Sequence, residues 1–400
     1  METPQLRFRG FNDSWEKKAF DDCVVIKSKL IDPQDDKYSD YPHIGTANME
    51  KHSGKLLDYK LVKEENLISG KYVFGEQDII YGKINPQLGK VVFPKFKGLC
   101  SADAYPLSAK KNVMEPGFLF QQLLTPRFLK YSISVSMRTG MPKINRSELS
   151  GFKFILPSLN EQKKIASFFS LLDGRVEKQQ AKIEALKEQR KGLLQKMFPQ
   201  RGEHEPSFRF NGFMGEWEEK QLRDLFEIRD ERQIPTIEAP LMAFTSTGGV
   251  EEKGDRYNRE FLVKNKSKKY KRTEFNDLIY SSNNLDVGAI GRNKYGTAVI
   301  SDVYEIFKTK EGVTPEFSEL IIQQKNFLNK VLKYRQGALY GQYRIHADDF
   351  LSVEINVPSL KEQTKIGRFF SLIDRHIKKE EQKLEALKEQ KKGFMQQMFI

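Results

Sequence analysis

The chain has 400 residues, and its 67 lysine and arginine residues exceed its 54 aspartate and glutamate residues, so the formal net charge is +13 and a polyanion is the leading class of partner. The length is sufficient for two or three domains, and a hydrophobic fraction of 38% excludes an intrinsically disordered chain. Two cysteines exclude a disulfide framework or a cysteine-rich zinc cluster and suit a reducing cytoplasm. The sequence has neither an apolar signal region nor a stretch of about 18 apolar residues, so we expect neither export nor a membrane span.

The most informative feature of the sequence is an internal repeat. A leader at residues 7–18 returns at residues 209–220, and each copy contains one of the two tryptophans, Trp15 and Trp217, which we expect to be core residues. A charged tail at residues 156–198 returns at residues 357–399, where roughly 25 of about 43 ungapped positions are identical. The chain is therefore two halves, each made of a leader, a body of about 130 residues and a tail.

This organisation predicts four consecutive segments. They are a first body domain at residues 1–157, a first helix at 158–199, a second body domain at 200–358 and a second helix at 359–400. The bodies match only faintly, for example at residues 78–81 with 277–280 and at 139–144 with 340–345. Such divergence is expected if each body recognises something different, and an old duplication that drifted under fold constraint alone is the alternative.

Each tail has the pattern of a long helix with one apolar seam. Ser158 with Glu161, and Ser359 with Glu362, predict a capping box in which the hydroxyl accepts a backbone N–H and the carboxylate reaches back. Apolar residues then recur at steps of three and four, which is typical of a coiled coil. The predicted pairing positions are Ile165, Phe169, Leu172, Val176, Ile183, Leu186, Ile366, Phe370, Ile373, Ile377, Leu384 and Leu387.

Such a helix would be about 58 Å long at about 1.5 Å per residue, and its apolar seam needs a partner. The nearest partner is the other copy, because even the polar interruptions at Gln179 and Arg190 coincide with those at Glu380 and Lys391. We therefore expect an α+β fold with two similar α/β-type domains, a pseudo-two-fold internal repeat, and two long antiparallel coiled-coil helices that act as a rod with a body near each end. Parallel pairing between two chains is the alternative.

No catalytic constellation is recognisable in the sequence. The five histidines are scattered and show no metal-ligand spacing with the cysteines. Residues 82–90 lack the glycine spacing and the hydroxyl of a phosphate-binding loop, and residues 85–88 lack the second proline and the aromatic residue of the adenine-methyltransferase signature. These absences favour a recognition chain without a catalytic or metal site of its own.

The doubled architecture resembles the specificity subunit of type I restriction-modification systems. The resemblance rests on the Pro-Ser-Leu-x-Glu-Gln-x-Lys-Ile motif at residues 157–165 and 358–366, and on the Trp-Glu end of each leader. It implies two target-recognition domains that each recognise one half of a bipartite DNA site, and a helical pair that sets the spacing and docks two modification subunits and the restriction subunits. It also implies no cofactor on this chain, S-adenosylmethionine on the modification subunits, and ATP and Mg on the restriction subunits. The assembled complex would be an adenine-N6 DNA methyltransferase and endonuclease.

Candidate DNA-contacting residues are those whose side chains can reach base edges or phosphates from turn-like segments. In the first body they are Lys83, Asn85, Gln87, Lys90, Arg138, Thr139, Lys143, Asn145 and Arg146. In the second body they are Asn283, Asn284, Arg292, Lys294, Arg335, Gln336, Tyr340, Gln342, Tyr343 and Arg344. A cationic run predicts weaker phosphate contacts from Lys264, Lys266, Lys268, Lys269, Lys271 and Arg272. Solvated loops and a solvated helix or strand face are the alternatives for these segments.

Two DNA-recognition domains held by one pair of helices should contact half-sites about one turn of B-DNA apart, roughly 34–36 Å between centres. The expected target is therefore an asymmetric bipartite site with an unread spacer. Three alternatives stay open: a divergent methyltransferase or nuclease, a coiled-coil scaffold without sequence-specific DNA contact, and the specificity chain of a methylation-only or combined cutting-modifying system.

Overall fold

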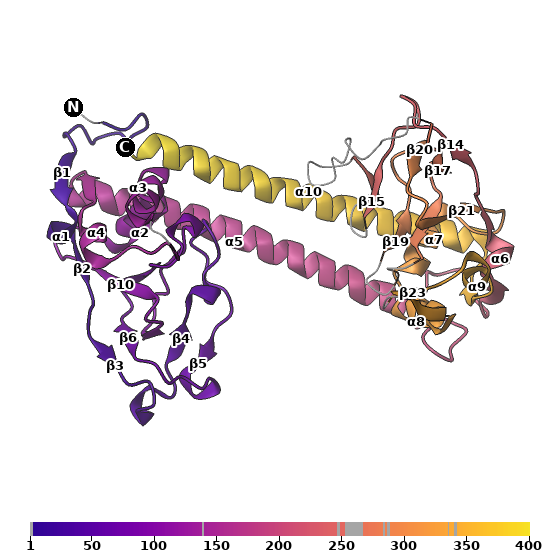
Figure 1. Cartoon of the computed structure of the whole chain (residues 1–400), viewed down its shortest axis with the longest axis horizontal. Helices are drawn as coiled ribbons and strands as arrows, with labels where there is room; N and C mark the ends of the chain where they lie inside the picture. The colour runs from indigo at the N-terminus through magenta and orange to yellow at the C-terminus, as the bar shows by residue number, and fades with distance from the viewer. Residues whose placement is uncertain are drawn as a thin grey trace. The chain divides into compact units, whose positions relative to one another are not determined.

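The computed structural model describes residues 3–137, 140–245, 249–252, 267–282, 285, 289–334, 336–339 and 342–400. The chain divides into two compact units. Unit 1 contains Met1–Ala181 and Gln382–Ile400, and unit 2 contains Lys182–Glu381. The two long helices, α5 (Leu159–Lys196) and α10 (Leu360–Met398), each contribute residues to both units (Figure 1). The units thus differ from the four consecutive segments expected from the sequence, because each half of a helix packs with a different body.

The body of unit 1 contains two main sheets. The first has the strand order β2 (Val24–Ile26), β10 (Ala104–Ala109), β7 (Asp78–Gly82) and β8 (Val91–Val92), all antiparallel. The second has the order β3 (Leu30–Ile31), β6 (Lys71–Phe74), β9 (Gly98–Cys100), β4 (Pro42–Ile44) and β5 (Lys60–Leu61). The leader strand pairs with the strand that precedes the long helix, β1 (Glu16–Ala19) with β11 (Lys153–Leu156). The helices of this body are α1 (Phe20–Cys23), α2 (Pro116–Leu124), α3 (Pro126–Ser136) and α4 (Arg146–Ser150).

Unit 2 repeats this plan although its body sequence has diverged. Its four-stranded sheet has the equivalent order β13 (Phe226–Ile228), β21 (Tyr304–Thr309), β18 (Leu278–Ser281) and β19 (Ile290–Arg292). Its leader strand β12 (Glu218–Gln221) likewise pairs with β24 (Glu354–Val357). The smaller sheets are β14 (Arg232–Gln233) with β17 (Tyr270–Thr273) and β20 (Ala298–Ile300), β15 (Ala243–Thr245) with β16 (Gly249–Glu251), and β22 (Gln336–Leu339) with β23 (Gln342–Arg344). Its helices are α6 (Leu222–Leu225), α7 (Pro315–Ile322), α8 (Lys325–Val331) and α9 (Ala347–Leu351). The α+β class and the internal repeat predicted from the sequence are confirmed.

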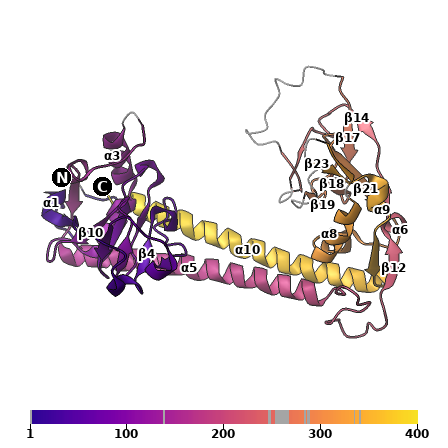
Figure 2. The ribbon, with the colours of Figure 1, turned by 60° about the horizontal axis from the view of Figure 1, so that its bottom comes forward.

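The long helices run antiparallel within each unit (Figure 1 and Figure 2). In unit 1, the Phe168 and Phe394 rings are 5.1 Å apart, and Lys391 Nζ lies 2.5 Å from Asp173 Oδ1. In unit 2, the Arg190 guanidinium lies 2.5 Å from Asp374 at the equivalent positions of the repeat. The polar interruptions of the seam therefore hold ion pairs between the helices. Of the predicted pairing positions, Val176, Leu186, Ile373 and Leu387 are half-buried and the others are buried.

The predicted capping box is only half present. Ser158 Oγ accepts a long hydrogen bond of 3.4 Å from Glu161 N, and Ser359 does the same for Glu362. The Glu161 carboxylate does not serve the backbone but accepts two bonds of 2.7 Å from Arg7 of the leader. The motif glutamate is thus an anchor for the leader, because a buried carboxylate is stabilised most by a bidentate arginine.

His43 in β4 is a buried titratable group of the five-stranded sheet. Burial lowers its pKa, although the nearby Glu65 carboxylate, 2.5 Å from His43 Nδ1, acts in the opposite direction. The imidazole takes up a proton near pH 6.5 in the unfolded chain and only at lower pH in the folded chain. The stability of unit 1 is therefore expected to decrease as the pH falls below about 6.5. Urea unfolding of His43→Gln should show a flatter pH dependence in that range, and a profile identical to the unaltered chain's would contradict this assignment.

Candidate nucleic-acid interface

Two candidate segments that lie far apart in the sequence meet at the end of β7. Residues 84 and 143 form an antiparallel bridge. Asn85 N donates to Pro142 O over 2.8 Å, and Ile144 N donates to Lys83 O over 3.0 Å. This contact, which we call the β7 junction (residues 83–85 and 142–144), places Lys83, Asn85 and Lys143 side by side. Sequence reasoning named both segments but could not place them together.

The β7 junction is cationic. Burial lowers the pKa of Lys83, and the neighbouring charges of Lys143 and Arg146 act in the same direction against the opposing charge of Asp103. The Lys83 ammonium also lies 5.2 Å from the centre of the Tyr105 ring, and the Lys143 side chain is exposed. Mutually repelling cations that are partly removed from water favour binding of an anion, such as a phosphate.

The half-buried Arg146 contacts the framework of unit 1, and its contact with DNA stays a prediction. Its guanidinium stacks on Tyr105 of β10 and Tyr72 of β6, at 4.9 and 5.7 Å from the ring centres. It also donates to the Tyr72 hydroxyl over 2.9 Å, so it ties the two sheets together. The aromatic partners come from distant parts of the chain, so the local sequence could not reveal this role.

Other candidates in unit 1 also have internal partners. Asn145 caps α4, since its Oδ1 accepts from Glu148 N over 2.9 Å. Lys90 Nζ donates to Thr46 O over 2.6 Å. Gln87 is exposed. Of these three side chains, Gln87 is exposed and the other two are half-buried, and DNA contact by any of them stays a prediction.

Unit 2 has the same junction with different chemistry. Ile345 N donates to Ser282 O over 3.2 Å, as Ile144 N does to Lys83 O in unit 1. Where Tyr105 pairs with Tyr81 across the sheet of unit 1, Glu305 pairs with Tyr280 in unit 2. The Glu305 carboxylate lies 2.7 Å from Lys271 Nζ and 3.6 Å from the Arg344 guanidinium. A cation braced by aromatic rings in one unit is therefore replaced by an ion-paired cluster in the other.

Several second-body candidates are engaged in ion pairs, which argues against base or phosphate contact. The Arg292 side chain is 9% exposed and binds Glu319 over 2.9 Å, and Lys294 Nζ lies 2.5 Å from the same carboxylate group. Lys271 is buried against Glu305, and the Arg272 guanidinium binds Glu274. Arginine and lysine paired with carboxylates from other segments are stabilised where they are, so a DNA phosphate would have to displace those partners. Lys268 and Lys269 of the cationic run remain exposed.

The remaining candidates cannot be placed as side chains. Gln336, Gln342 and Tyr343 lie in β22 and β23. The others lie outside the described residues: Arg138, Thr139, Lys264, Lys266, Asn283, Asn284, Arg335 and Tyr340.

Sequence reasoning missed the role of the motif glutamine. In unit 1, Gln162 Nε2 donates to Pro157 O and Val113 O, both over 3.1 Å, and its Oε1 accepts from Glu115 N over 2.9 Å. Gln363 makes the equivalent three bonds in unit 2, to Pro358 O, Gly312 O and Thr314 N. The signal was available, because Glu-Gln recurs in both tails. The glutamate and glutamine of this motif together hold the start of each long helix against the body of its unit.

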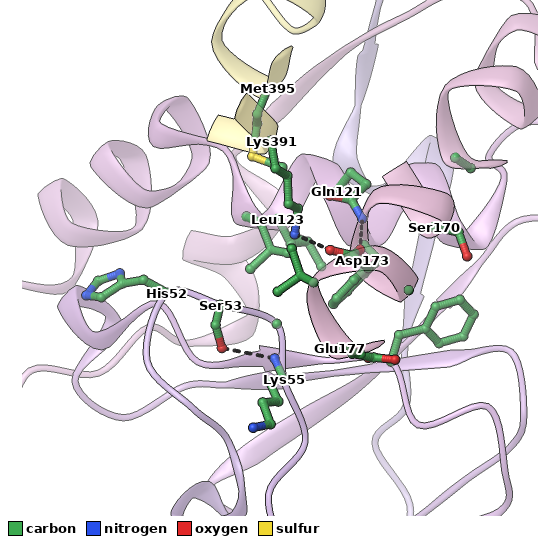
Figure 3. A pocket seen from close by; sticks show the side chains of 18 of the residues that line it. His52, Ser53, Lys55, Gln121, Leu123, Ser170, Asp173, Glu177, Lys391 and Met395 are labelled. Atoms are coloured by element: carbon green, nitrogen blue, oxygen red, sulfur yellow. Dashed lines mark hydrogen bonds and ion pairs between the residues drawn. The ribbon is translucent and has the colours of Figure 1, made fainter. Parts of the chain in front are cut away.

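Unit 1 also contains a groove of about 1270 Å³ between its body and its part of the helix pair (Figure 3). The Asp173–Lys391 ion pair crosses it, and Gln121 Nε2 donates to Asp173 Oδ2 over 3.3 Å. Across the described part of the chain, no three histidine, cysteine, aspartate or glutamate side chains are placed to hold a metal ion. No helix in the same described ranges is both long and apolar enough to cross a membrane.

Comparison with known proteins identifies similar chains. The model of the type I restriction modification DNA specificity domain matches residues 12–188 and again residues 214–389. The specificity subunit of the type I restriction enzyme EcoDI of Escherichia coli is 37% identical over 153 residues, which are 38% of this chain and 33% of that relative. The MjaVIII specificity subunit of Methanocaldococcus jannaschii is 25% identical over 96% of this chain and 91% of its own. The crystal structure of the S subunit of a type I restriction-modification system from M. genitalium shares the fold, with a TM-score of 0.62 at 15% identity over 100% of this chain and 99% of that one.

Proposed function

Because the chain belongs to the family of type I restriction-modification DNA specificity domains and contains that domain twice, we propose that each unit reads one half of an asymmetric bipartite DNA site. The observation that supports this most directly is the junction shared by both units. The same junction presents Lys83 beside the Tyr105 ring in unit 1 and the exposed Arg344 beside Glu305 in unit 2. Two frameworks of one kind with different side chains suit two different half-sites.

In this proposal the chain supplies specificity without catalysis of its own and carries no cofactor. The long helices set the spacing of the half-sites, about one turn of B-DNA. Two modification subunits would dock on the chain and methylate adenine with S-adenosylmethionine. Restriction subunits would use ATP and Mg to translocate and cut. The specificity chain of a methylation-only or combined cutting-modifying system would use the same DNA interface.

Exchanging the first body tests the proposal. Residues 1–155 are replaced by the equivalent body of another specificity chain, and methylated sites are mapped by sequencing DNA from cells that carry the complete system. One half-site should change while the other half and the spacer persist. A methylation pattern unchanged in both halves, or one short continuous palindrome, would refute bipartite recognition by these units.

Lys143 is expected to contribute to DNA binding through phosphate. Lys143→Ala should weaken binding to all sequences by a similar factor and lower the slope of log affinity against log salt by about 1. The matched control is Lys17→Ala, which removes an exposed lysine on β1 of the same unit. Titration of labelled duplex at several salt concentrations measures both quantities. Equal salt slopes for the two variants would remove Lys143 from the interface.

A further inference from the structure

Arg344 of β23 is an exposed cation at the junction of unit 2. It has the place in the repeat that Lys143 has in unit 1, because residues 340–345 match residues 139–144. Its side chain is 54% exposed, and one of its terminal nitrogens lies 3.6 Å from Oε1 of Glu305 in β21. At that distance the two charges attract each other without a hydrogen bond, so the guanidinium keeps its N–H donors for a partner.

The backbone beside Arg344 is fixed by the body of unit 2. The buried Ile345 donates its N–H to Ser282 O over 3.2 Å, and its carbonyl accepts from the Tyr280 hydroxyl over 3.1 Å. Tyr280 is itself fully buried and stacks on Phe350, with 4.7 Å between the ring centres. A side chain mounted on fixed backbone starts from a defined position, so it can discriminate between bases.

Glu305 joins the framework of unit 2 to this exposed arginine. Its side chain is 12% exposed, and its Oε2 lies 2.7 Å from Nζ of the buried Lys271 in β17. That pair balances the buried charge of the carboxylate inside the unit. The other oxygen, Oε1, attracts Arg344, so it restricts the guanidinium to one side of the junction.

The matched position of unit 1 has no carboxylate. Tyr105 pairs with Tyr81 across the sheet there, as Glu305 pairs with Tyr280 in unit 2. A tyrosine ring carries no net charge, so it does not orient the exposed Lys143 as Glu305 orients the equivalent arginine. This one strand position therefore decides whether a carboxylate orients the junction cation.

A neighbouring carboxylate favours contact with a base over contact with a phosphate. The Glu305 charge repels a phosphate, which lowers the gain from placing one beside Arg344. The acceptor atoms of a base edge carry no formal charge and are repelled much less. A guanidinium presents parallel N–H donors in a fixed plane, and these match O6 and N7 of guanine in the major groove.

We propose that Arg344 reads a guanine in the half-site of unit 2 and that Glu305 is the positioning residue that directs it. This inference rests on the proposed function and adds a base, the side chain that recognises it and the carboxylate that orients that side chain. The half-site that persists when residues 1–155 are exchanged belongs to unit 2, and it should contain at least one G·C pair.

The test measures binding of labelled duplexes by the full chain in its assembled complex. The duplexes carry each base pair in turn at every position of the half-site of unit 2. With the unaltered chain, replacing the recognised guanine should weaken binding about 5- to 150-fold. Arg344→Ala should remove the preference at that one position, while the preferences at the other positions persist.

Glu305→Gln keeps the shape of the side chain and removes its charge. The guanine preference should fall about 2- to 12-fold, because Arg344 is then ordered only on binding. Affinity for unrelated sequences should not fall, since a negative charge near the DNA is lost. A merely structural role would lower both. The matched control is Glu227→Gln, which removes an exposed carboxylate on β13 and should leave the guanine preference unchanged.

A second variant separates positioning from stability, because Glu305→Gln leaves Lys271 buried without its anion. Lys271→Met with Glu305→Gln removes both charges, so it should recover the melting temperature while the guanine preference stays reduced. A preference that survives Glu305→Gln, or that returns with stability in the double variant, would overturn the positioning role.

The base assignment has its own contrary outcomes. A guanine preference that survives Arg344→Ala, or a half-site of unit 2 without a G·C pair, would overturn it and leave bipartite recognition standing. An unaltered chain whose binding ignores every base of both half-sites would refute the proposed function instead.

Discussion

Phe399→Ala is expected to destabilise unit 1, although the body of that unit is built from the first half of the chain. Phe399 is buried, with its ring 5.4 Å from Phe118 of α2 and 5.6 Å from Phe169 of α5. Truncating a buried phenylalanine removes its burial and leaves a cavity, which costs about 3–5 kcal/mol of unfolding free energy. The antiparallel pairing brings this ring into unit 1.

The matched variant is Phe198→Ala, which should destabilise unit 2 by a similar amount. The Phe198 ring stacks on Phe317 at 5.3 Å and lies 5.6 Å from Trp217. Because Trp15 lies in unit 1 and Trp217 in unit 2, and the chain has 2 tryptophans, Trp217→Phe and Trp15→Phe backgrounds report each unit separately by fluorescence during denaturant unfolding. Loss of stability in the wrong unit, or in neither, would contradict the packing described.

The second large effect is expected at Arg7. Its guanidinium makes two bonds of 2.7 Å to the Glu161 carboxylate, whose side chain is 1% exposed. Arg7→Ala leaves that carboxylate buried without its partner, and removal of one member of a buried ion pair costs about 3–5 kcal/mol. Denaturant unfolding of the full chain, followed through Trp15, measures this loss. Arg209→Ala should act equally on unit 2, because Arg209 binds Glu362 with the same geometry.

A double variant separates the two sources of that effect. Arg7→Met with Glu161→Leu removes both charges and replaces them with apolar groups of similar volume, so it should recover most of the stability lost in Arg7→Ala. A double variant as unstable as the single one would mean that shape, rather than the unpaired charge, accounts for the loss. A loss below about 1 kcal/mol in the single variant would mean that water reaches Glu161.

Much of the architecture follows from local patterns. The ungapped tail repeat, the three-and-four spacing of apolar residues and the Pro-Ser-Leu start predicted two long helices, which the structure contains as α5 and α10. Helix periodicity and turn residues act over a few positions, so one sequence is enough to recognise them. The weak match at Asp78–Tyr81 with Asp277–Tyr280 also marked equivalent strands, because β7 and β18 occupy the same place in their four-stranded sheets. Asp78 and Asp277 accept equivalent bonds from Lys27 and Arg229.

The candidate interface was predictable only in part. The segments at 83–90 and 136–146 were recognised by composition, but their junction depends on a backbone bond between Asn85 and Pro142. Arg146 and Arg292 were predicted to contact DNA, and in the structure their side chains contact a tyrosine ring and a carboxylate of distant segments. An arginine is held within its own unit when a tyrosine or a carboxylate from a distant segment lies within hydrogen-bonding distance, and it is available to DNA when neither does.

The sequence by itself determined the duplication and the two long helices, because periodicity and repetition are properties of order along the chain. It indicated the resemblance to the family, and it left parallel pairing between two chains as an alternative to antiparallel pairing. The tertiary structure alone decided how those segments are grouped and which cations are free. Pairing the helices antiparallel places Phe399 in the first unit and Phe198 in the second, so each unit is completed by the tail of the other half. Contacts between residues far apart in the sequence, such as Arg7 with Glu161, have no local signature. These contacts decide whether a charged side chain stabilises the fold or is available to bind a partner.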